Sequence, residues 1–154
     1  MEKEQKIAPF LWFNGNLEEA LNLYTSVFKN TKIIFANRAG NKIINAKFQL
    51  EGVEFMALDG GPAYAFNPAI SFFVNCDTQD EVDELWDKLI ANGGAPNRCG
   101  WLRDKFGVSW QIIPQALGQL LNDPNPAKAK KVMDAMLQMD KIEIQKLKDA
   151  YAEA

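Results

Sequence analysis

Apolar and polar positions along the chain follow a pattern that occurs twice. Residues 10–14 form an apolar strand that runs into a helix capped by Asn16, and residues 70–75 form a second strand, with Asp77 or Thr78 capping a second helix. The apolar helix faces match at an offset of 62 residues: Ala20, Tyr24, Val27 and Phe28 fall on Val82, Trp86, Leu89 and Ile90. The pattern therefore predicts a duplicated unit.

Each half closes with a glycine turn and an apolar strand, at residues 52–58 and 107–113. Before the closing strand, the first half holds two strands joined by a turn at residues 39–41, and the second half holds a shorter counterpart at residues 99–106. We predict two tandem βαβββ modules, residues 7–59 and 69–114, with a linker at residues 60–68. After Pro114 the apolar period becomes helical, and residues 115–154 are predicted to form a C-terminal helical extension within the same structural domain.

Composition excludes several classes of partner. The chain has 154 residues, of which 47% are apolar and 24% charged, as in ordinary globular domains. Its net charge of -3 lacks the basic excess that nucleic-acid binding needs. Two cysteines are too few for a disulfide framework, residues 1–6 show no apolar leader, and no apolar run approaches a membrane span. We expect a cytoplasmic protein with no nucleic-acid or membrane partner.

The chain contains no histidine. This composition excludes a histidine general base, a Ser-His or Cys-His nucleophile pair and any histidine-ligated metal. Function must therefore rest on other side chains.

Several short motifs carry a family resemblance. They are LDGGP at residues 58–62, FN at 66–67, AISF at 69–72, CGWL at 99–102, DKFGVSWQI at 104–112 and VMDAMLQM at 132–139. With them the chain, tail included, resembles the PhnB-like family, often described as 3-demethylubiquinone-9 3-methyltransferase. That family lies in the glyoxalase or vicinal oxygen chelate superfamily, together with the dihydroxybiphenyl dioxygenase-like enzymes. The methyltransferase description finds no support in the residues, because no glycine-rich strand-to-helix turn of the nucleotide-binding kind is present.

The resemblance implies an α+β fold in which paired βαβββ modules form a U-shaped mixed sheet, with helices on the convex face and the ligand in the concavity. It also implies a homodimer, with or without exchanged strands or tails. Metal-bearing members hold their metal at four strand positions, which here are Pro9, Met56, Ala69 and Gln111. Proline and alanine side chains offer no ligand atom, and a thioether with one amide does not suit a divalent cation. We expect neither a metal nor another cofactor.

Strand side chains alternate, so the same four positions predict which side chains line the concavity. The predicted lining mixes apolar walls with few polar groups, which is typical of small-molecule pockets. It comprises Leu11, Phe13, Glu54, Met56, Ser71, Phe73, Trp101, Arg103, Ser109 and Gln111. The opposite set is predicted to pack beneath the helices: Phe10, Trp12, Phe55, Phe72, Val74, Val108, Trp110 and Ile112.

Two of these residues allow opposed interpretations. Glu54 is either a general base whose pKa burial raises, or a carboxylate that meets water or pairs with Arg103. Gln111 either orients a substrate through its amide or is satisfied by backbone groups.

Cys99 and Trp101 are similarly open. Cys99 is either a thiol activated by neighbouring arginines or a small buried apolar residue. Trp101 either stacks on a planar ligand or packs in a core or dimer contact. Asp59 and Asp104 are interpreted as turn-forming carboxylates rather than as an acid pair.

Two classes of function follow. The first is a metal-free homodimer that binds an unidentified small molecule in the sheet concavity. The second is a metal-independent enzyme of the same fold, in which Glu54 or Cys99 serves proton transfer or addition to an electrophile. Methyl transfer to a quinol is an alternative that rests on the family description alone.

Overall fold

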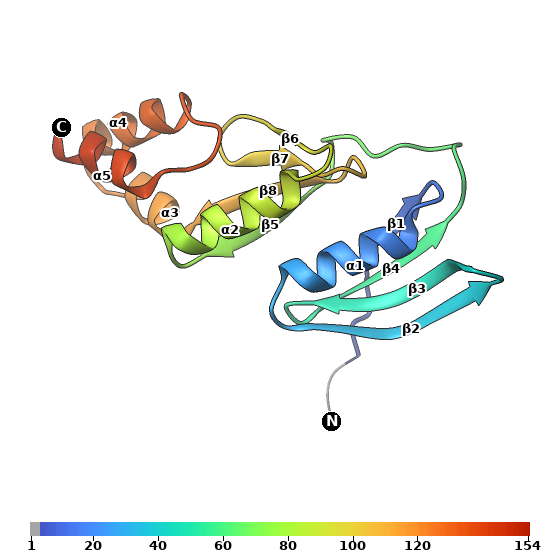
Figure 1. Cartoon of the computed structure of the whole chain (residues 1–154). Coiled ribbons are helices and arrows are strands. Elements are labelled where there is room, and N and C mark those ends of the chain that lie inside the picture. The colour runs from blue at the N-terminus through green and yellow to red at the C-terminus, as the bar shows by residue number, and fades with distance from the viewer. Residues whose placement is uncertain (1–3) are drawn as a thin grey trace. The chain divides into compact units, whose positions relative to one another are not determined.

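The computed structural model describes residues 4–154 and contains the element order βαβββ twice, followed by three helices (Figure 1). The first run is β1 (Phe10–Phe13), α1 (Leu17–Val27), β2 (Thr31–Ala39), β3 (Lys42–Leu50) and β4 (Val53–Asp59). The second is β5 (Ser71–Cys76), α2 (Gln79–Ile90), β6 (Ala95–Pro96), β7 (Trp101–Arg103) and β8 (Ser109–Pro114). The extension is α3 (Gln115–Leu121), α4 (Pro126–Met136) and α5 (Ile144–Ala152). The chain divides between Phe66 and Asn67 into two compact units, each with its own mixed sheet, and the predicted α+β class is confirmed.

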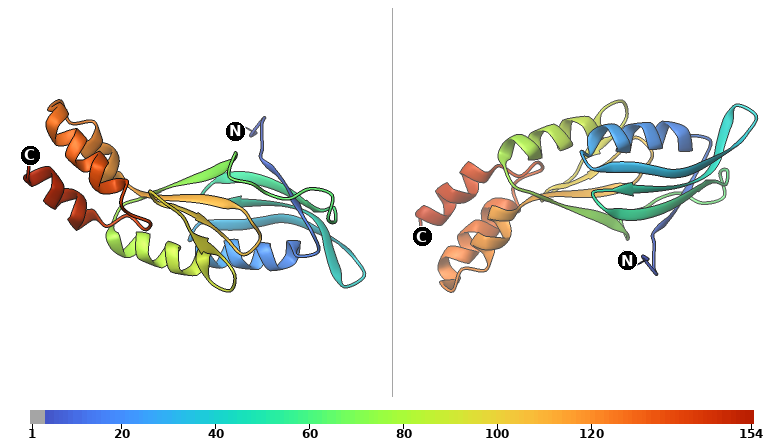
Figure 2. Two further views of the ribbon diagram at one scale, coloured as in Figure 1. Left: turned by 90° about the horizontal axis from the view of Figure 1, so that it is seen from above. Right: turned by 90° about the horizontal axis from the view of Figure 1, so that it is seen from below.

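The sheet of the first unit has the strand order β1-β4-β3-β2, with β1 parallel to β4 and the other pairs antiparallel. Helix α1 lies along one face of this sheet (Figure 2). Its apolar stripe is buried, because Leu17, Ala20, Leu21, Tyr24 and Val27 recur at helical spacing on one side. The sheet side chains beneath it are also buried: Leu11, Phe13, Ala46, Phe48, Phe55 and Ala57.

The second unit repeats this arrangement with the order β5-β8-β7-β6 and with α2 on one face. Of the two predicted caps of α2, Asp77 and Thr78, the structure selects Thr78, whose hydroxyl accepts a hydrogen bond from the Glu81 N–H at 3.2 Å. Its buried face is Val82, Leu85, Trp86 and Leu89, and the buried strand residues opposite are Leu102, Trp110 and Ile112.

The turn between β1 and α1 departs from the prediction. Asn16 occupies the N-cap position, but its side chain caps nothing, and its buried Oδ1 has no hydrogen-bond partner among the described residues. The turn is closed instead by Asp59, whose Oδ1 accepts a hydrogen bond from the Gly15 N–H at 2.7 Å, while Lys42 pairs with its other oxygen at 3.2 Å. Asp59 is thus a turn-forming carboxylate, as predicted.

The C-terminal helices pack on the end of β8 through a core of Ile113, Leu117, Val132, Met139, Ile142 and Leu147. Helix α4 begins at Pro126, and the Asn125 side chain accepts a hydrogen bond from the Ala127 N–H at 3.0 Å. None of the helices in residues 4–154 has the length and apolar character of a membrane-crossing segment.

Candidate ligand-binding site

The second sheet leaves one face uncovered by α2. Strand pairing sets Ser71 against Ser109 and Phe73 against Gln111, and sets Gln111 against Trp101 and Ser109 against Arg103. Directly paired side chains lie on the same side of a sheet, so these six residues share the open face. That they bind a ligand stays a prediction.

Two aromatic side chains flank Gln111 on this face. Phe73 is 54% exposed and Trp101 is half-buried, and each lies on a strand next to β8, on opposite sides of Gln111. Neighbouring strands are about 4.8 Å apart, so the two aromatic residues start about 10 Å from each other. The three residues form a row that we call the aromatic row: Phe73, Gln111 and Trp101.

Polar groups beside the aromatic row are few. The Gln111 Nε2 donates a hydrogen bond to the Ser71 Oγ at 2.9 Å, so its partner is a side chain and not a backbone group, as one of the two interpretations of Gln111 had it. Ser109 is buried, and Arg103 is exposed. This combination of aromatic walls, one amide, hydroxyls and a guanidinium can hold a small organic molecule.

The first sheet corrects the prediction for Leu11 and Phe13. Phe10 pairs with Met56, and Trp12 pairs with Leu58, so Phe10 and Trp12 occupy the open face. Leu11 and Phe13 are instead buried beneath α1, at 7% and 1% exposure. The prediction took Pro9 as a residue that faces the concavity and alternated from it along the strand, but the pairing of Phe10 with Met56 shows that the opposite set faces outward. The same shift removes Pro9 from the face that bears Met56.

Glu54 and Met56 do lie on the open face of the first sheet, but the ion-pair partner of Glu54 is Lys47 and not Arg103. Its carboxylate pairs with Lys47 at 2.7 Å, and the side chains are only 15% and 27% exposed. A hydrogen bond from Lys47 to Glu54 raises the pKa of Lys47, so the ammonium stays charged. The alternation Ala46-Lys47-Phe48, in which both neighbours of Lys47 are buried, is the sequence signal that could have placed Lys47 on this face.

Gln5 fixes the backbone of Glu54 from a second direction. The Gln5 Nε2 donates to the Glu54 carbonyl at 2.8 Å, and the Gln5 Oε1 accepts from the Glu54 N–H at 3.0 Å. A carboxylate held in an ion pair is a weak candidate for a general base, because the ammonium occupies an oxygen that would otherwise accept a proton. The geometry therefore favours a structural role for Glu54.

Cys99 lies at a tight turn between β6 and β7. Its backbone adopts a left-handed φ of 60°, and its N–H donates to the Met139 carbonyl at 2.8 Å. The neighbouring Arg98 guanidinium donates to the Leu137 carbonyl at 3.4 Å. The segment thus ties the second sheet to the C-terminal extension, and the catalytic role of Cys99 stays a prediction. Cys76 is fully buried, and burial raises the pKa of its thiol to about 12.

Asp104, the other predicted turn carboxylate, is 1% exposed. Its Oδ1 accepts hydrogen bonds from the Phe106 N–H at 2.9 Å and the Val108 N–H at 3.0 Å, and its Oδ2 accepts from the Trp110 Nε1 at 2.9 Å. These contacts confirm a structural role at the turn into β8.

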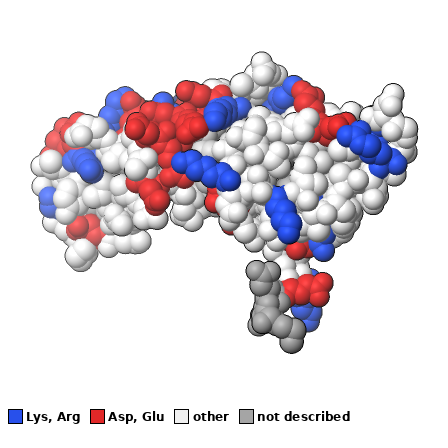
Figure 3. All heavy atoms as spheres, turned by 60° about the horizontal axis from the view of Figure 1, so that its bottom comes forward, with Lys and Arg blue, Asp and Glu red and all other residues white. Residues whose placement is uncertain are grey.

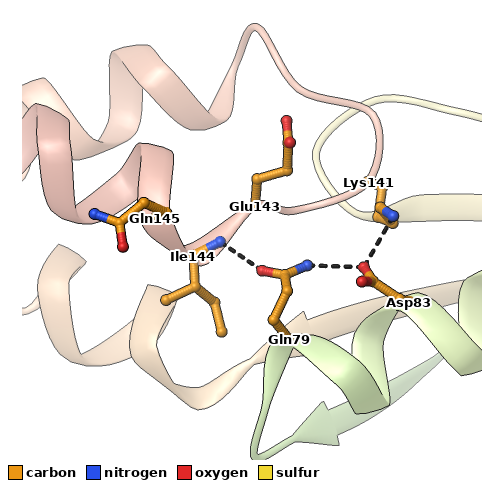
Figure 4. A pocket seen from close by; sticks show the side chains of 6 residues that line it. All are labelled: Gln79, Asp83, Lys141, Glu143, Ile144 and Gln145. Carbon is orange, nitrogen blue, oxygen red and sulfur yellow. Dashed lines mark hydrogen bonds and ion pairs between the residues drawn. The ribbon is translucent and has the colours of Figure 1, made fainter.

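A hollow of about 340 Å³ lies between α2 and the start of α5 (Figure 4). Its polar lining is engaged internally: Gln79 donates to Asp83 at 3.0 Å and accepts from the Ile144 N–H at 2.7 Å. Lys141 pairs with Asp83 at 2.8 Å. These contacts fasten the extension to α2 and leave few groups for a ligand. A second hollow, of about 400 Å³, lies at the N-terminus of α1 beside Asn16, Lys42 and Asp59.

The residues at the four superfamily positions do not fit a divalent cation. Gln111 already engages Ser71, Met56 offers only a thioether, and Ala69 and Pro9 offer no side-chain donor. Within residues 4–154, no group of three acidic or cysteine side chains is arranged to hold a metal ion. For a nucleotide-type cofactor, the described strand-to-helix turns provide no glycine-rich loop, since Gly60 follows β4 into the linker and Gly93 follows α2.

Comparisons with known proteins match this architecture. A family model described as 3-demethylubiquinone-9 3-methyltransferase matches residues 5–113, which span both modules and end within β8. The tail motif at residues 132–139 lies outside that match. A search of curated proteins finds no match.

Solved structures with the same fold include a Bacillus cereus PhnB protein described as a 3-demethylubiquinone-9 3-methyltransferase. It is 38% identical, with a TM-score of 0.66, and the match covers 71% of this chain and 99% of that one. Pseudomonas aeruginosa protein PA1353 is 26% identical, with a TM-score of 0.59 and coverage of 72% and 98%. A glyoxalase-related enzyme from Fulvimarina pelagi is 20% identical, with a TM-score of 0.53 and coverage of 72% and 88%, and shares the fold.

Proposed function

The chain belongs to the 3-demethylubiquinone-9 3-methyltransferase family, the PhnB-like branch of the glyoxalase superfamily, and we propose that it binds a small molecule without a metal ion. The binding surface in this proposal is the sheet face that the helices leave open, centred on the aromatic row of the second sheet. One observation carries the proposal: Phe73 is 54% exposed beside a half-buried Trp101, with the Gln111 amide between them. Exposed aromatic side chains around a fixed polar group are typical of ligand sites.

The four positions that hold the metal in metal-bearing superfamily members carry residues here that do not suit a divalent cation. This supports a binding role over metal-dependent catalysis of the glyoxalase kind. The ion pair of Glu54 with Lys47 at 2.7 Å supports a binding role, because it engages the carboxylate that was the candidate for a general base. Methyl transfer, which the family description suggests, has no assigned residue in this proposal.

Native mass spectrometry of the purified full chain tests the proposal. We expect a co-purified molecule of a few hundred daltons that persists in EDTA and is lost from a Phe73→Ala, Trp101→Ala double variant. A matched control is Tyr64→Ala, which removes an aromatic side chain that is 69% exposed but lies outside both sheets. Loss of the molecule on metal removal would contradict the metal-free proposal. Calorimetric binding of S-adenosylmethionine would replace it with methyl transfer.

We also propose that the protein acts as a homodimer. Support comes from the edge strand β2, where Ile33, Ile34 and Phe35 are 44%, 39% and 40% exposed. An exposed apolar edge strand is normally covered by a partner, because its unpaired backbone groups otherwise invite aggregation. Light scattering on the full chain should give twice the chain mass of 17.3 kDa, and a mass equal to a single chain would refute the dimer.

A cytoplasmic location completes the proposal. Cys76 and Cys99 are both free thiols, which is usual in a reducing compartment. Alkylation of intact cells followed by peptide mass spectrometry should find Cys99 reduced, and an oxidised Cys99 would argue for another compartment.

A further inference from the structure

Arg103 is the single charged residue in the four strands of the second sheet. The strands β5 to β8 otherwise contain only apolar and neutral polar residues. The strands of the first sheet, in contrast, carry acidic and basic residues that pair with one another or with α1, as in Lys47–Glu54 and Arg38–Glu18. Arg103 is therefore the one residue of this sheet whose charge could attract a charged ligand.

Strand β7 places Arg103 beside the aromatic row. Arg103 pairs with Ser109 on β8 and follows Trp101 by two residues on β7, so both side chains lie on the open face. Two residues along a strand span about 6.6 Å, which is the separation along β7 between the backbone positions of Trp101 and Arg103. Among residues 4–154, no carboxylate pairs with Arg103.

Acidic side chains gather elsewhere on this unit. The sequence of α2 contains Asp80, Glu81, Asp83, Glu84 and Asp87, and Figure 3 shows a dense patch of carboxylates where α2 lies. Helix α2 covers the opposite face of the sheet, so the open strand face carries a positive charge and no negative one. Such a face is complementary to an anion.

Resting on the proposed function, we infer that the ligand is a small planar organic anion, with a carboxylate or a similar oxyanion attached to a flat ring system. Arg103 binds the anionic group, because the planar guanidinium fork matches two carboxylate oxygens. The ring lies over Gln111 between Phe73 and Trp101, where about 10 Å of width accommodates one ring system. Gln111 acts as a positioning residue, since its amide is fixed by Ser71 at 2.9 Å.

Calorimetric titration of the full chain tests this inference with a matched pair of probes. The probes are 2-naphthoate and 2-naphthamide, which share shape and ring system and differ in charge. We expect the carboxylate to bind at least about tenfold more tightly than the amide, because a charge-assisted bidentate contact is lost with the amide. The preference should weaken as salt is raised.

Two variants assign the effect to one side chain. Arg103→Gln should weaken 2-naphthoate binding about tenfold and leave 2-naphthamide unchanged. The control is Arg98→Gln, since Arg98 is also exposed in this unit but contacts the Leu137 carbonyl, and this variant should bind both probes like the wild type. Circular dichroism checks that each variant is folded.

Equal binding of the two probes, or an unchanged carboxylate preference in Arg103→Gln, would overturn the inference while leaving small-molecule binding intact. Failure of both probes to bind at millimolar concentration would also overturn it. The proposed function has its own outcome, the co-purified molecule seen by native mass spectrometry, so the two can fail separately.

Discussion

Replacement of Asp104 should destabilise the second unit strongly. The carboxylate is 1% exposed and accepts hydrogen bonds from the Phe106 and Val108 N–H groups and from the Trp110 Nε1. Asp104→Ala leaves these donors without an acceptor. Val108 and Trp110 are each 3% exposed, so water cannot readily take the place of the carboxylate at their donors.

The structure sets the size of the effect. An unsatisfied buried donor costs about 1–3 kcal/mol, so two buried donors and one half-buried donor predict a loss of about 4 kcal/mol in the free energy of unfolding. Asp104→Asn keeps one acceptor oxygen for the backbone groups but turns an amide N–H toward the indole N–H, and should lose about 2 kcal/mol. Trp110→Phe should lower the free energy of unfolding less in the Asp104→Asn background than in the wild type, because it removes the indole N–H that opposes the new amide N–H.

Urea unfolding followed by tryptophan fluorescence measures these losses, since Trp86, Trp101 and Trp110 all lie in the second unit. With an m-value of about 2 kcal/mol/M, Asp104→Ala should lower the midpoint by about 2 M. The control is Asp80→Asn, an exposed aspartate in the first turn of α2 that should shift stability by less than about 1 kcal/mol, the usual contribution of a charge at a helix end. A loss in Asp104→Ala no larger than in the control would refute the structural role of this carboxylate.

Three further outcomes follow from the packing. Burial would raise the pKa of Asp59, but the Gly15 N–H and Lys42 hold this pKa below its usual value. The ionised Asp59 therefore stabilises the folded state at neutral pH, and this contribution should be lost as the pH drops below about 4, the pKa of an aspartate in the unfolded chain. Asp59→Asn should lower the free energy of unfolding by about 1–2 kcal/mol at pH 7, and in acid unfolding curves its stability should decrease less with falling pH than that of the wild type. The same decrease in both proteins would argue against the pairing of Asp59 with Gly15 and Lys42. Ellman's reagent should label Cys99 in the folded protein and Cys76 only after unfolding, because burial raises the pKa of Cys76 to about 12; early labelling of both would contradict the packing. Gly60→Ala would place a methyl carbon 2.3 Å from the Trp12 ring and should lower the unfolding free energy by about 2 kcal/mol. The matched Gly118→Ala enters open space on α3 and should not destabilise the protein, and equal losses in the two variants would contradict the Gly60 contact.

The helices and the module repeat could be predicted because their signals are local. The apolar stripe of α1 and the N-cap of α2 each depend on residues within about ten positions of one another in the sequence. The structure confirms the stripe and shows that Thr78 is the cap. Asn16 shows where local signals stop: its residue type favours capping, but Asp59 reaches the same turn from 43 residues away in the sequence. Sequence alone does not reveal that contact.

The open faces of the two sheets also differ in how far local sequence could predict them. The second module preserved its strand phase, because Ser71 and Phe73 pair in register with Ser109 and Gln111. In the first module, four consecutive apolar residues, Phe10–Phe13, carry no alternation, so only the pairing of Phe10 with Met56 shows which side faces outward. The Lys47–Glu54 pair depends on the same long-range register and was missed for that reason.

Nuclear magnetic resonance of the four tryptophan indole N–H groups shows directly whether a planar organic anion binds the open face of the second sheet without a metal. Addition of 2-naphthoate in the presence of EDTA should shift the Trp101 signal, assigned with Trp101→Phe, and leave the signals of the buried Trp86 and Trp110 nearly unchanged. A Trp101 signal that does not move, or one that moves only after a divalent metal is added, would contradict metal-free binding of a planar anion at this face.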